Sequence, residues 1–349
     1  MTLNFCTLFN SSYLSRGLVM YESLAQNCAD FHLYIYAFDE KSEEVLKKLK
    51  LSKATIIGLK EFESPELLAV KKERTAAEYC WTCSAATIHY SITTFNLSNC
   101  TYIDADMQFF ADPRILFDEM GDRSALITAH RYTSAYDQSA ISGKYCVQFV
   151  TFKNDSKGME ILEWWRQSCL KWCYARVEDG KFGDQKYLDE FQSRFGGVHE
   201  LKHLGGGLAP WNIQQYTFTC NERIKGHETS TGNEFAPIFF HFHGLKFYEE
   251  NILSLTGELY DITPNIIETF YVPYVKLLNE AKERISDVDA SFNPHGSAGK
   301  SSYPPLNFFV IMRFYLSGVK RSIGNVFGKG LRQRIRHHYY FYNDTRFHA

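Results

Sequence analysis

The sequence predicts an α/β fold in which a mostly parallel sheet is flanked by helices. Short apolar runs alternate with longer segments of helical spacing from residue 3 to about residue 174. This order of strands and helices favours a parallel sheet that is covered on both faces. The composition agrees, because 45% of the 349 residues are hydrophobic and only 22% are charged. Such a chain can bury a large core without a disulfide or a zinc ion.

The first expected strand covers residues 3–9, an apolar run that stops at a polar Asn-Ser-Ser loop. Residues 18–26 carry apolar side chains at helical spacing, and residues 31–38 alternate in the manner of a strand. Ser42 is a candidate N-cap for a helix that ends at residue 49, because its hydroxyl can accept from a free backbone N–H. Residues 54–58 form the next short strand.

The expected order continues with a long helix and an apolar strand that ends in acids. The Asp112-Pro113 pair is typical of a helix start, since proline is tolerated in the first turn. In sheets of this kind ligands bind at the carboxyl ends of strands, so polar residues just after a strand carry the most weight. The remaining expected elements are helices over residues 75–95, 113–120 and 159–174, and strands over residues 100–104, 125–129 and 146–152.

Charge is distributed unevenly along the chain, although 38 Lys and Arg nearly balance 40 Asp and Glu. Residues 313–349 contain eight Lys or Arg and one Asp, so this tail carries +7 and residues 1–312 carry −9 of the net −2. A linker-like stretch separates the two parts. We therefore expect a main domain over residues 1–285, a linker over 286–305, and a helical, basic and aromatic appendage over 306–349. The acidic main domain argues against a nucleic-acid partner.

The start of the chain and its cysteines favour a cytoplasmic protein. The first six residues lack the basic region of a signal peptide, and the longest apolar stretch, residues 306–319, is too short to span a bilayer comfortably. Cys80 and Cys83 have the spacing of a redox pair but are interpreted as buried apolar residues. The tail has two open interpretations, a peripheral anchor on the anionic inner face of the membrane or a helical cap on the acidic domain. A nucleic-acid arm is a third, which the acidic main domain disfavours.

The sharpest chemical feature is Asp104-Ala105-Asp106, which directly follows an apolar strand. Two carboxylates on a short turn are ligands that Mg²⁺ or Mn²⁺ prefers, with phosphate oxygens of a substrate filling other positions. A solvated pair of loop acids is the alternative interpretation. The position after a strand, at the ligand edge of the predicted sheet, favours a metal site.

Three further segments carry polar groups that could belong to the same site. His241 and His243 share a face if their segment is a strand, and Lys246 follows them. An imidazole can complete a carboxylate metal site, and an ammonium can neutralise phosphate. Gly183-Asp184-Gln185 places an acid at a helix start, where an ordinary N-cap is the other interpretation. The loop of residues 10–17 offers an amide, a ring and a cation, but no glycine-rich phosphate-binding motif.

Together these motifs resemble those of nucleotide-sugar glycosyltransferases with the GT-A fold. Their order is similar to that in the group of glycogenin and the lipopolysaccharide galactosyl- and glucosyltransferases, often called glycosyltransferase family 8. The resemblance covers about residues 3–250, with five motifs in the family's order. It implies a Rossmann-like GT-A domain, a nucleotide-sugar donor and Mn²⁺ or Mg²⁺ as cofactor.

The resemblance also implies roles for individual residues. The metal ligands would be Asp104, Asp106 and His241. The nucleotide sugar would lie against Thr7, Asn10, Tyr13, Arg16, Arg74, Asp104 and Lys246. Asp184 and Gln185 match the family's Gly-Asp-Gln motif, and Gln148 stands where the family has an asparagine that faces the acceptor, so these three are the expected catalytic residues. The late motif departs from the family, because Lys246 is one residue closer to His241 and Phe247-Tyr248 replaces Pro-Trp.

The implied activity is transfer of a hexose from a UDP-sugar or related donor to a hydroxyl of a glycan or a lipid-linked acceptor, with retention of anomeric configuration. The metal would stabilise the diphosphate as it leaves. A nucleotidyltransferase would need a glycine-rich basic loop after the first strand, where this sequence has Asn-Ser-Ser-Tyr. A HAD-type phosphatase would need an early Asp-x-Asp motif followed by Thr or Val, whereas here the motif comes late and is followed by Met-Gln. A catalytically silent nucleotide-sugar-binding or scaffold protein is the remaining alternative, which the presence of all three expected metal ligands disfavours.

Overall fold

The computed structural model describes residues 2–249, 252–256, 260–299, 339–341 and 347. Its centre is a seven-stranded sheet with the strand order β3-β2-β1-β4-β7-β6-β8. β7 runs antiparallel to both of its neighbours, and the other paired strands are parallel. The predicted α/β fold with a mostly parallel sheet is therefore confirmed. The strands are β1 (Leu3–Phe9), β2 (Phe31–Ala37), β3 (Ala54–Gly58), β4 (Asn99–Ile103), β6 (Ala125–Ala129), β7 (Tyr145–Lys153) and β8 (Val198–Glu200).

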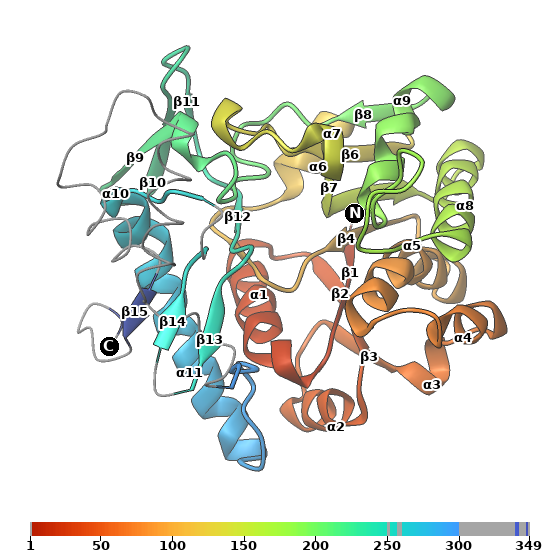
Figure 1. The fold of residues 1–349 in the computed structure, drawn as a ribbon, viewed down its shortest axis with the longest axis horizontal. Helices are drawn as coiled ribbons and strands as arrows, with labels where there is room; N and C mark the ends of the chain where they lie inside the picture. Colours follow the sequence, from red (N-terminus) through yellow and green to blue (C-terminus); the bar gives the residue numbers. More distant parts are fainter. Residues whose placement is uncertain (1, 250–251, 257–259, 300–338, 342–346, 348–349) are drawn as a thin grey trace.

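Helices cover both faces of this sheet (Figure 1). Alternate side chains of β1 enter different cores, because successive residues of a strand point to opposite faces. Phe5 packs into the core that also contains residues of α1 and α11, whereas Cys6 packs into the core that contains residues of α5 and α8. The main helices are α1 (Leu14–Asn27), α2 (Glu40–Leu49), α5 (Ala76–Thr94), α6 (Arg114–Met120), α8 (Ser156–Lys171) and α11 (Val272–Val288), and the short ones are α3 (Leu59–Phe62), α4 (Pro65–Lys71), α7 (Ser139–Ser142), α9 (Phe191–Arg194) and α10 (Pro264–Ile266).

The helix starts follow local capping chemistry, with one correction to the sequence prediction. Ser42 was the expected N-cap of α2, but Asp39 holds that position and accepts from the Ser42 backbone N–H. The Ser42 hydroxyl in turn accepts from the Asp39 backbone N–H, which completes a capping box. Thr75 and Glu78 form the same arrangement at the start of α5.

Three small sheets add to the central one. The pairing of β5 (Met107–Phe109) with β12 (Phe239–His241) joins segments more than a hundred residues apart. The second small sheet contains β9 (Tyr216–Cys220), β10 (Ile224–Glu228) and β11 (Glu234–Phe235). The third contains β13 (Lys246–Tyr248), β14 (Ile252–Ser254) and β15 (Tyr339–Phe341). None of the described helices is both long enough and apolar enough to cross a bilayer.

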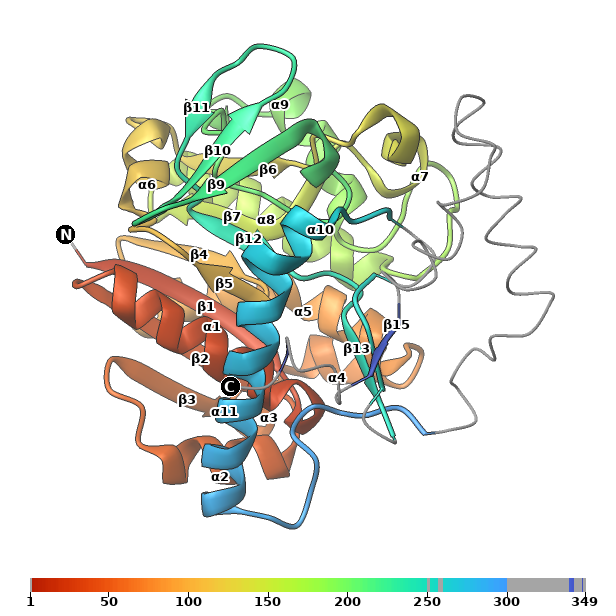
Figure 2. The ribbon, with the colours of Figure 1, turned by 90° about the vertical axis from the view of Figure 1, so that its left-hand side faces the viewer.

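The C-terminal part returns to the main domain where the structure describes it. Residues 293–298 of the predicted linker pack against the loop that follows β1 and against β13. Most of the predicted appendage lies outside the described residues. The described parts are β15, which pairs with β14, and Phe347, which is fully buried in the core that contains α1 and α11. Figure 2 shows α11 running alongside α1 on this face.

Candidate metal centre

Asp104, Asp106 and His241 converge at the carboxyl end of β4. Asp104 directly follows β4, and Asp106 directly precedes β5. β12 pairs antiparallel with β5 and places His241 opposite Met107, next to the acidic turn. The Nε2 atom of His241 lies 3.1 Å from Oδ1 of Asp106 and 3.8 Å from Oδ2 of Asp104. One ligand atom from each residue lies within 4.8 Å of the other two, so all three could bind one ion.

Backbone hydrogen bonds hold this turn in place. The Asp104 N–H donates to the Gln148 carbonyl of β7 at 3.3 Å, and the Phe242 N–H donates to the Asp106 carbonyl at 2.9 Å. The His241 N–H donates to the Leu208 carbonyl at 2.8 Å. Three separate segments therefore fix the acidic turn and the histidine relative to one another, which gives the site little freedom to rearrange.

The three side chains influence one another's protonation strongly. Burial raises the pKa of Asp104, and the nearby Asp106 carboxylate adds to this effect while His241 opposes it. Burial disfavours the charge on His241, but Asp106 and Asp104 outweigh it and hold its pKa well above the ordinary value. A cation is thus favoured at Nε2. A divalent metal would replace that proton and would neutralise both carboxylates.

Gln148 sets the orientation of the histidine. Its Oε1 atom lies 2.8 Å from Nδ1 of His241, and the glutamine is fully buried. An amide oxygen accepts a hydrogen bond, so Nδ1 carries the hydrogen and Nε2 faces the carboxylates. Two carboxylates and an oriented imidazole fit a divalent cation such as Mn²⁺ or Mg²⁺. Gln148, predicted to face the acceptor, is buried and contacts the side of the histidine that points away from the carboxylates.

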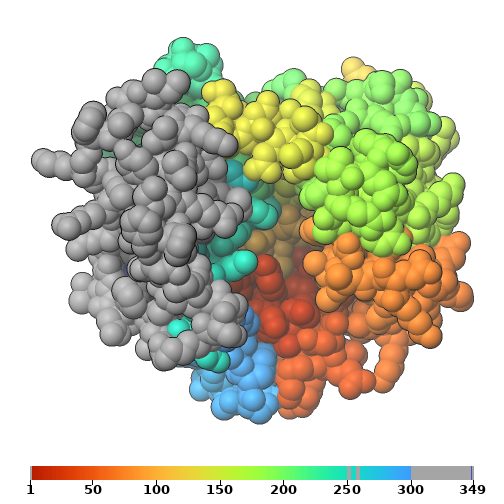
Figure 3. Space-filling model, viewed as in Figure 1, coloured from red at the N-terminus to blue at the C-terminus, as the bar shows by residue number. Residues whose placement is uncertain are grey.

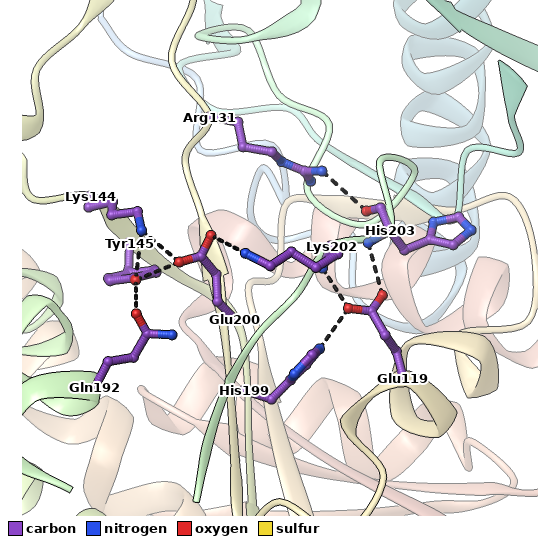
Figure 4. Close-up of polar contacts among 9 residues, drawn as sticks. All are labelled: Glu119, Arg131, Lys144, Tyr145, Gln192, His199, Glu200, Lys202 and His203. Atoms are coloured by element: carbon purple, nitrogen blue, oxygen red, sulfur yellow. Dashed lines mark hydrogen bonds and ion pairs between the residues drawn. The ribbon is translucent and has the colours of Figure 1, made fainter. Parts of the chain in front are cut away.

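A polar network anchors the loop that supports His241 (Figure 4). Glu119 accepts from Nε2 of His199 at 2.6 Å and from the backbone N–H groups of Lys202 and His203. Glu200 accepts from Lys144, Tyr145 and Lys202. These contacts fix residues 199–203, just before the segment whose Leu208 carbonyl accepts from His241. The network therefore holds residues 199–203, from which the chain continues to Leu208.

The loop after β1 places an exposed ring beside the carboxylates. Tyr13 is 42% exposed, yet surrounding protein and the charge of Asp106 raise the pKa of its hydroxyl. Asn10 precedes the short 3-10 turn Ser11–Tyr13, and its carbonyl accepts from the Tyr13 N–H. Thr7 lies inside β1 and is fully buried. Figure 3 shows the surface hollowed in the middle of this face, between the N-terminal segments in red and orange and the segments in yellow and green.

Arg16 links three segments that meet beside this loop. Its guanidinium donates to the carbonyls of His295 at 2.9 Å and Leu245 at 3.1 Å. It also lies over the rings of Tyr13 and Phe247. The side chain is 3% exposed. Arg16 was predicted to bind the nucleotide, but its guanidinium group contacts protein carbonyls and aromatic rings. These contacts hold Tyr13 and the segment that leads to Lys246 in place.

Residues 293–298 pack directly on the loop after β1. The Ser15 hydroxyl contacts Nδ1 of His295 at 2.9 Å, and the His295 ring stacks on Phe247 with a centroid distance of 4.1 Å. Gly296 has a positive φ of 61°, and a Cβ atom there would lie 2.7 Å from the Ser12 carbonyl oxygen. Only glycine permits this close approach without displacing the loop.

Asp184 is a buried acid near Asp104 of the carboxylate turn. It is 5% exposed, and burial raises its pKa to about 7, with a further contribution from the charge of Asp104. Asp184 occupies the N-cap position of the 3-10 helix Gln185–Glu190, as the alternative interpretation expected, but its side chain makes no capping hydrogen bond. The Gln185 amide donates to the Ser142 carbonyl at 2.7 Å, which ties this segment to α7.

Arg74 and Lys246 lie in different surroundings. Arg74 donates to the carbonyls of Cys169, Leu170 and Cys173 at the C-terminal end of α8. A cation at that position satisfies the free carbonyls of a helix end. Lys246 begins β13 and is exposed, two residues after Gly244.

Trp211 also lies at the site, although no motif in the sequence indicated it. Its ring packs edge-on against His241 and His243.

No protein-family model matches the sequence. The uncharacterized protein YfnD of Bacillus subtilis strain 168 is 30% identical over 299 residues, which cover 83% of this chain and 92% of YfnD. The chain belongs to the YfnD family. The B. subtilis protein YfnF is similar to it as well, with 29% identity over 306 residues, 85% of this chain and 98% of YfnF.

Solved glycosyltransferases are similar in structure to this member of the YfnD family. The galactosyltransferase LgtC in complex with donor and acceptor sugar analogues has a TM-score of 0.46 at 10% identity, covering 80% of this chain and 96% of LgtC. The bifunctional glycosyltransferase WbbM has a TM-score of 0.46 at 10% identity, covering 83% of this chain and 52% of WbbM. Mouse xyloside xylosyltransferase 1 has a TM-score of 0.42 at 13% identity, covering 70% of this chain and 98% of the mouse chain.

Proposed function

We propose that the protein is a metal-dependent glycosyltransferase. It would transfer a hexose from a UDP-sugar or related nucleotide sugar to a hydroxyl of a glycan or lipid-linked acceptor, with retention of configuration. The observation that carries this proposal is the cluster of Asp104, Asp106 and His241 at the carboxyl end of β4. The order of its motifs, which resembles that of glycosyltransferase family 8, supports it further.

The three ligands would hold Mn²⁺ or Mg²⁺ against the diphosphate of the donor. Bound there, the metal supplies positive charge that stabilises the leaving diphosphate. The exposed Tyr13 ring offers a stacking surface for the base, and Asn10 offers polar groups at the same loop. Lys246 adds a second cation on the exposed side of the site.

Asp184 would bind the sugar of the donor. It is buried, and burial raises its pKa to about 7, so below that pH the carboxyl group is mostly neutral and would offer both a donor and an acceptor to a sugar hydroxyl. Gln185 extends the same segment, and its amide nitrogen is held by α7. Asp184 and Gln185 are therefore both proposed to contact the sugar.

The buried residues of the sequence-based site take supporting roles in this proposal. Thr7 and Arg16 would hold the donor loop, Gln148 would orient His241, and Arg74 would stabilise the end of α8. The catalytic unit would extend to about residue 299, because residues 293–298 pack on the donor loop.

Release of nucleoside diphosphate tests the proposed function. Purified protein is incubated with a panel of nucleotide sugars, with and without Mn²⁺, and free diphosphate is measured over time. We expect slow Mn²⁺-dependent hydrolysis of at least one donor by the wild type and none by Asp104→Asn/Asp106→Asn. Binding of a nucleotide sugar without any release on added glycan acceptors would favour the silent scaffold instead.

We further propose that the basic tail binds anionic membranes and brings the enzyme to a lipid-linked acceptor. Each Lys or Arg near such a surface contributes about 1 kcal/mol. Replacing Arg332, Arg334 and Arg336 with glutamine should lower co-sedimentation with anionic vesicles without removing residues 339–341 and 347, which contact the main domain. Equal sedimentation of the variant and the wild type would contradict the anchor.

A further inference from the structure

His243 lies next to the metal centre but has no role among the proposed ligands. It follows β12 by two residues and is exposed. Gly244 comes next with a positive φ of 84°, and this turn carries the chain away from the site toward Lys246. The backbone thus presents the His243 ring to solvent, whereas the His241 ring is buried against Gln148.

Aromatic contacts fix the position of the His243 ring. Its centroid lies 5.5 Å from the Trp211 ring at an interplanar angle of 61°, and 5.7 Å from the His241 ring at 83°. Trp211 is itself held, because its Nε1–H donates to the His130 carbonyl at 3.0 Å. An exposed side chain that is packed in this way can meet a ligand with little loss of conformational entropy.

Charged groups of the metal centre and of Lys246 lie close enough to His243 to interact with it electrostatically. Asp106 interacts electrostatically with His243, and so do His241 and Lys246. An imidazole ring carries at least one N–H donor in either protonation state. It can therefore donate a hydrogen bond to an anion that is bound at the neighbouring metal centre.

We propose that His243 donates a hydrogen bond to the diphosphate of the nucleotide that the metal centre holds. This inference rests on the proposed function. A diphosphate on a metal at Asp104, Asp106 and His241, and within reach of Lys246, would pass the exposed His243 ring on the same side of the site. His243 is then a binding residue that gives the diphosphate a fixed orientation, which the metal alone cannot impose.

Separate binding measurements on metal and nucleotide test this role. Mn²⁺ alone is titrated by electron paramagnetic resonance, and UDP and inorganic pyrophosphate are titrated calorimetrically in the presence of Mn²⁺. For His243→Ala we expect an unchanged Mn²⁺ affinity and a loss of about tenfold in affinity for both UDP and pyrophosphate. His243→Asn, which keeps an N–H donor, should recover part of the loss. His227→Ala, on β10, is the matched control and should bind like the wild type.

The outcomes separate this inference from the function on which it rests. If His243→Ala binds UDP and pyrophosphate like the wild type, the proposed hydrogen bond is wrong. If it loses Mn²⁺ affinity in proportion, His243 is a metal ligand and the proposal is also wrong. If the wild type itself binds no nucleoside diphosphate with Mn²⁺, both this inference and the proposed function fail. Thermal unfolding of each variant identifies any loss that comes from misfolding.

Discussion

The buried Gln148 amide oxygen lies 2.8 Å from Nδ1 of His241, on the side of the ring that faces away from Asp106. This hydrogen bond leaves the Nε2 atom of the histidine directed at the two carboxylates. A histidine that binds a metal through one nitrogen commonly donates from the other, and such partners tune metal affinity. From this position Gln148 can influence the metal site through the orientation of His241.

Replacing Gln148 should weaken metal binding although the residue cannot contact the metal. Gln148→Leu leaves the Nδ1–H of His241 without its acceptor, and we expect Mn²⁺ affinity to fall roughly 10- to 100-fold. Gln148→Glu keeps an acceptor and should stay closer to the wild type. Electron paramagnetic resonance titration of free Mn²⁺ measures both variants. Wild-type affinity in the leucine variant would show that the amide does not orient the histidine.

The contact between residues 293–298 and the donor loop can be tested with two glycines. Gly296→Ala and Gly232→Ala both place a side chain at positive φ, which costs roughly 1–2 kcal/mol. Only the Gly296 methyl would meet another segment, Ser12, because nothing lies near Gly232. We expect the Gly296 variant to be less stable than the Gly232 variant in urea unfolding and to bind UDP with Mn²⁺ more weakly. Similar stability and similar UDP affinity in both variants would mean that the segment does not position the loop.

The buried Asp184 should make stability depend on pH in a defined direction. Its pKa is about 7 in the folded protein and ordinarily near 3.8, so between these values the folded state holds a proton that the unfolded state has lost. Stability therefore falls as pH rises from about 4 to about 7, by roughly 4 kcal/mol at most from this group.

The variant Asp184→Asn isolates this effect because it removes the ionisable group. In urea unfolding without metal or nucleotide, we expect the variant to gain stability relative to the wild type as pH rises from 4.5 to 8. The difference in unfolding free energy between the variant and the wild type should stop growing above about pH 7.5. A stability difference that does not change with pH would show that Asp184 is not held protonated.

The sequence predicted six of the seven strands of the central sheet because each of the six is defined by its own residues, whereas the short edge strand β8 was not predicted. The apolar run before Asp104 and the alternation over residues 31–38 are local signals, and both segments form strands. Asp39 was missed as the cap of α2 because Asp39 and Ser42 are both good caps, and only the backbone geometry of the turn decides between them.

The site was less predictable because its geometry depends on long-range pairing. The pairing of β12 with β5 brings His241 to the carboxylates, and a motif resemblance indicated that association without showing its geometry. Burial could not be derived from residue type. Gln148, Arg16 and Arg74 are polar residues expected to face ligands, yet each is bonded to protein groups in the interior. The role of residues 293–298 was hidden by a composition that is typical of linkers.

The metal centre is the central claim, and diffraction from crystals grown with Mn²⁺ and UDP tests it most directly. Anomalous scattering locates manganese without reference to the protein model. We predict one manganese ion bound by Asp104, Asp106 and Nε2 of His241, with diphosphate oxygens on its open side. A nucleotide bound with no manganese at these three residues, or manganese bound elsewhere together with the diphosphate, would contradict the account.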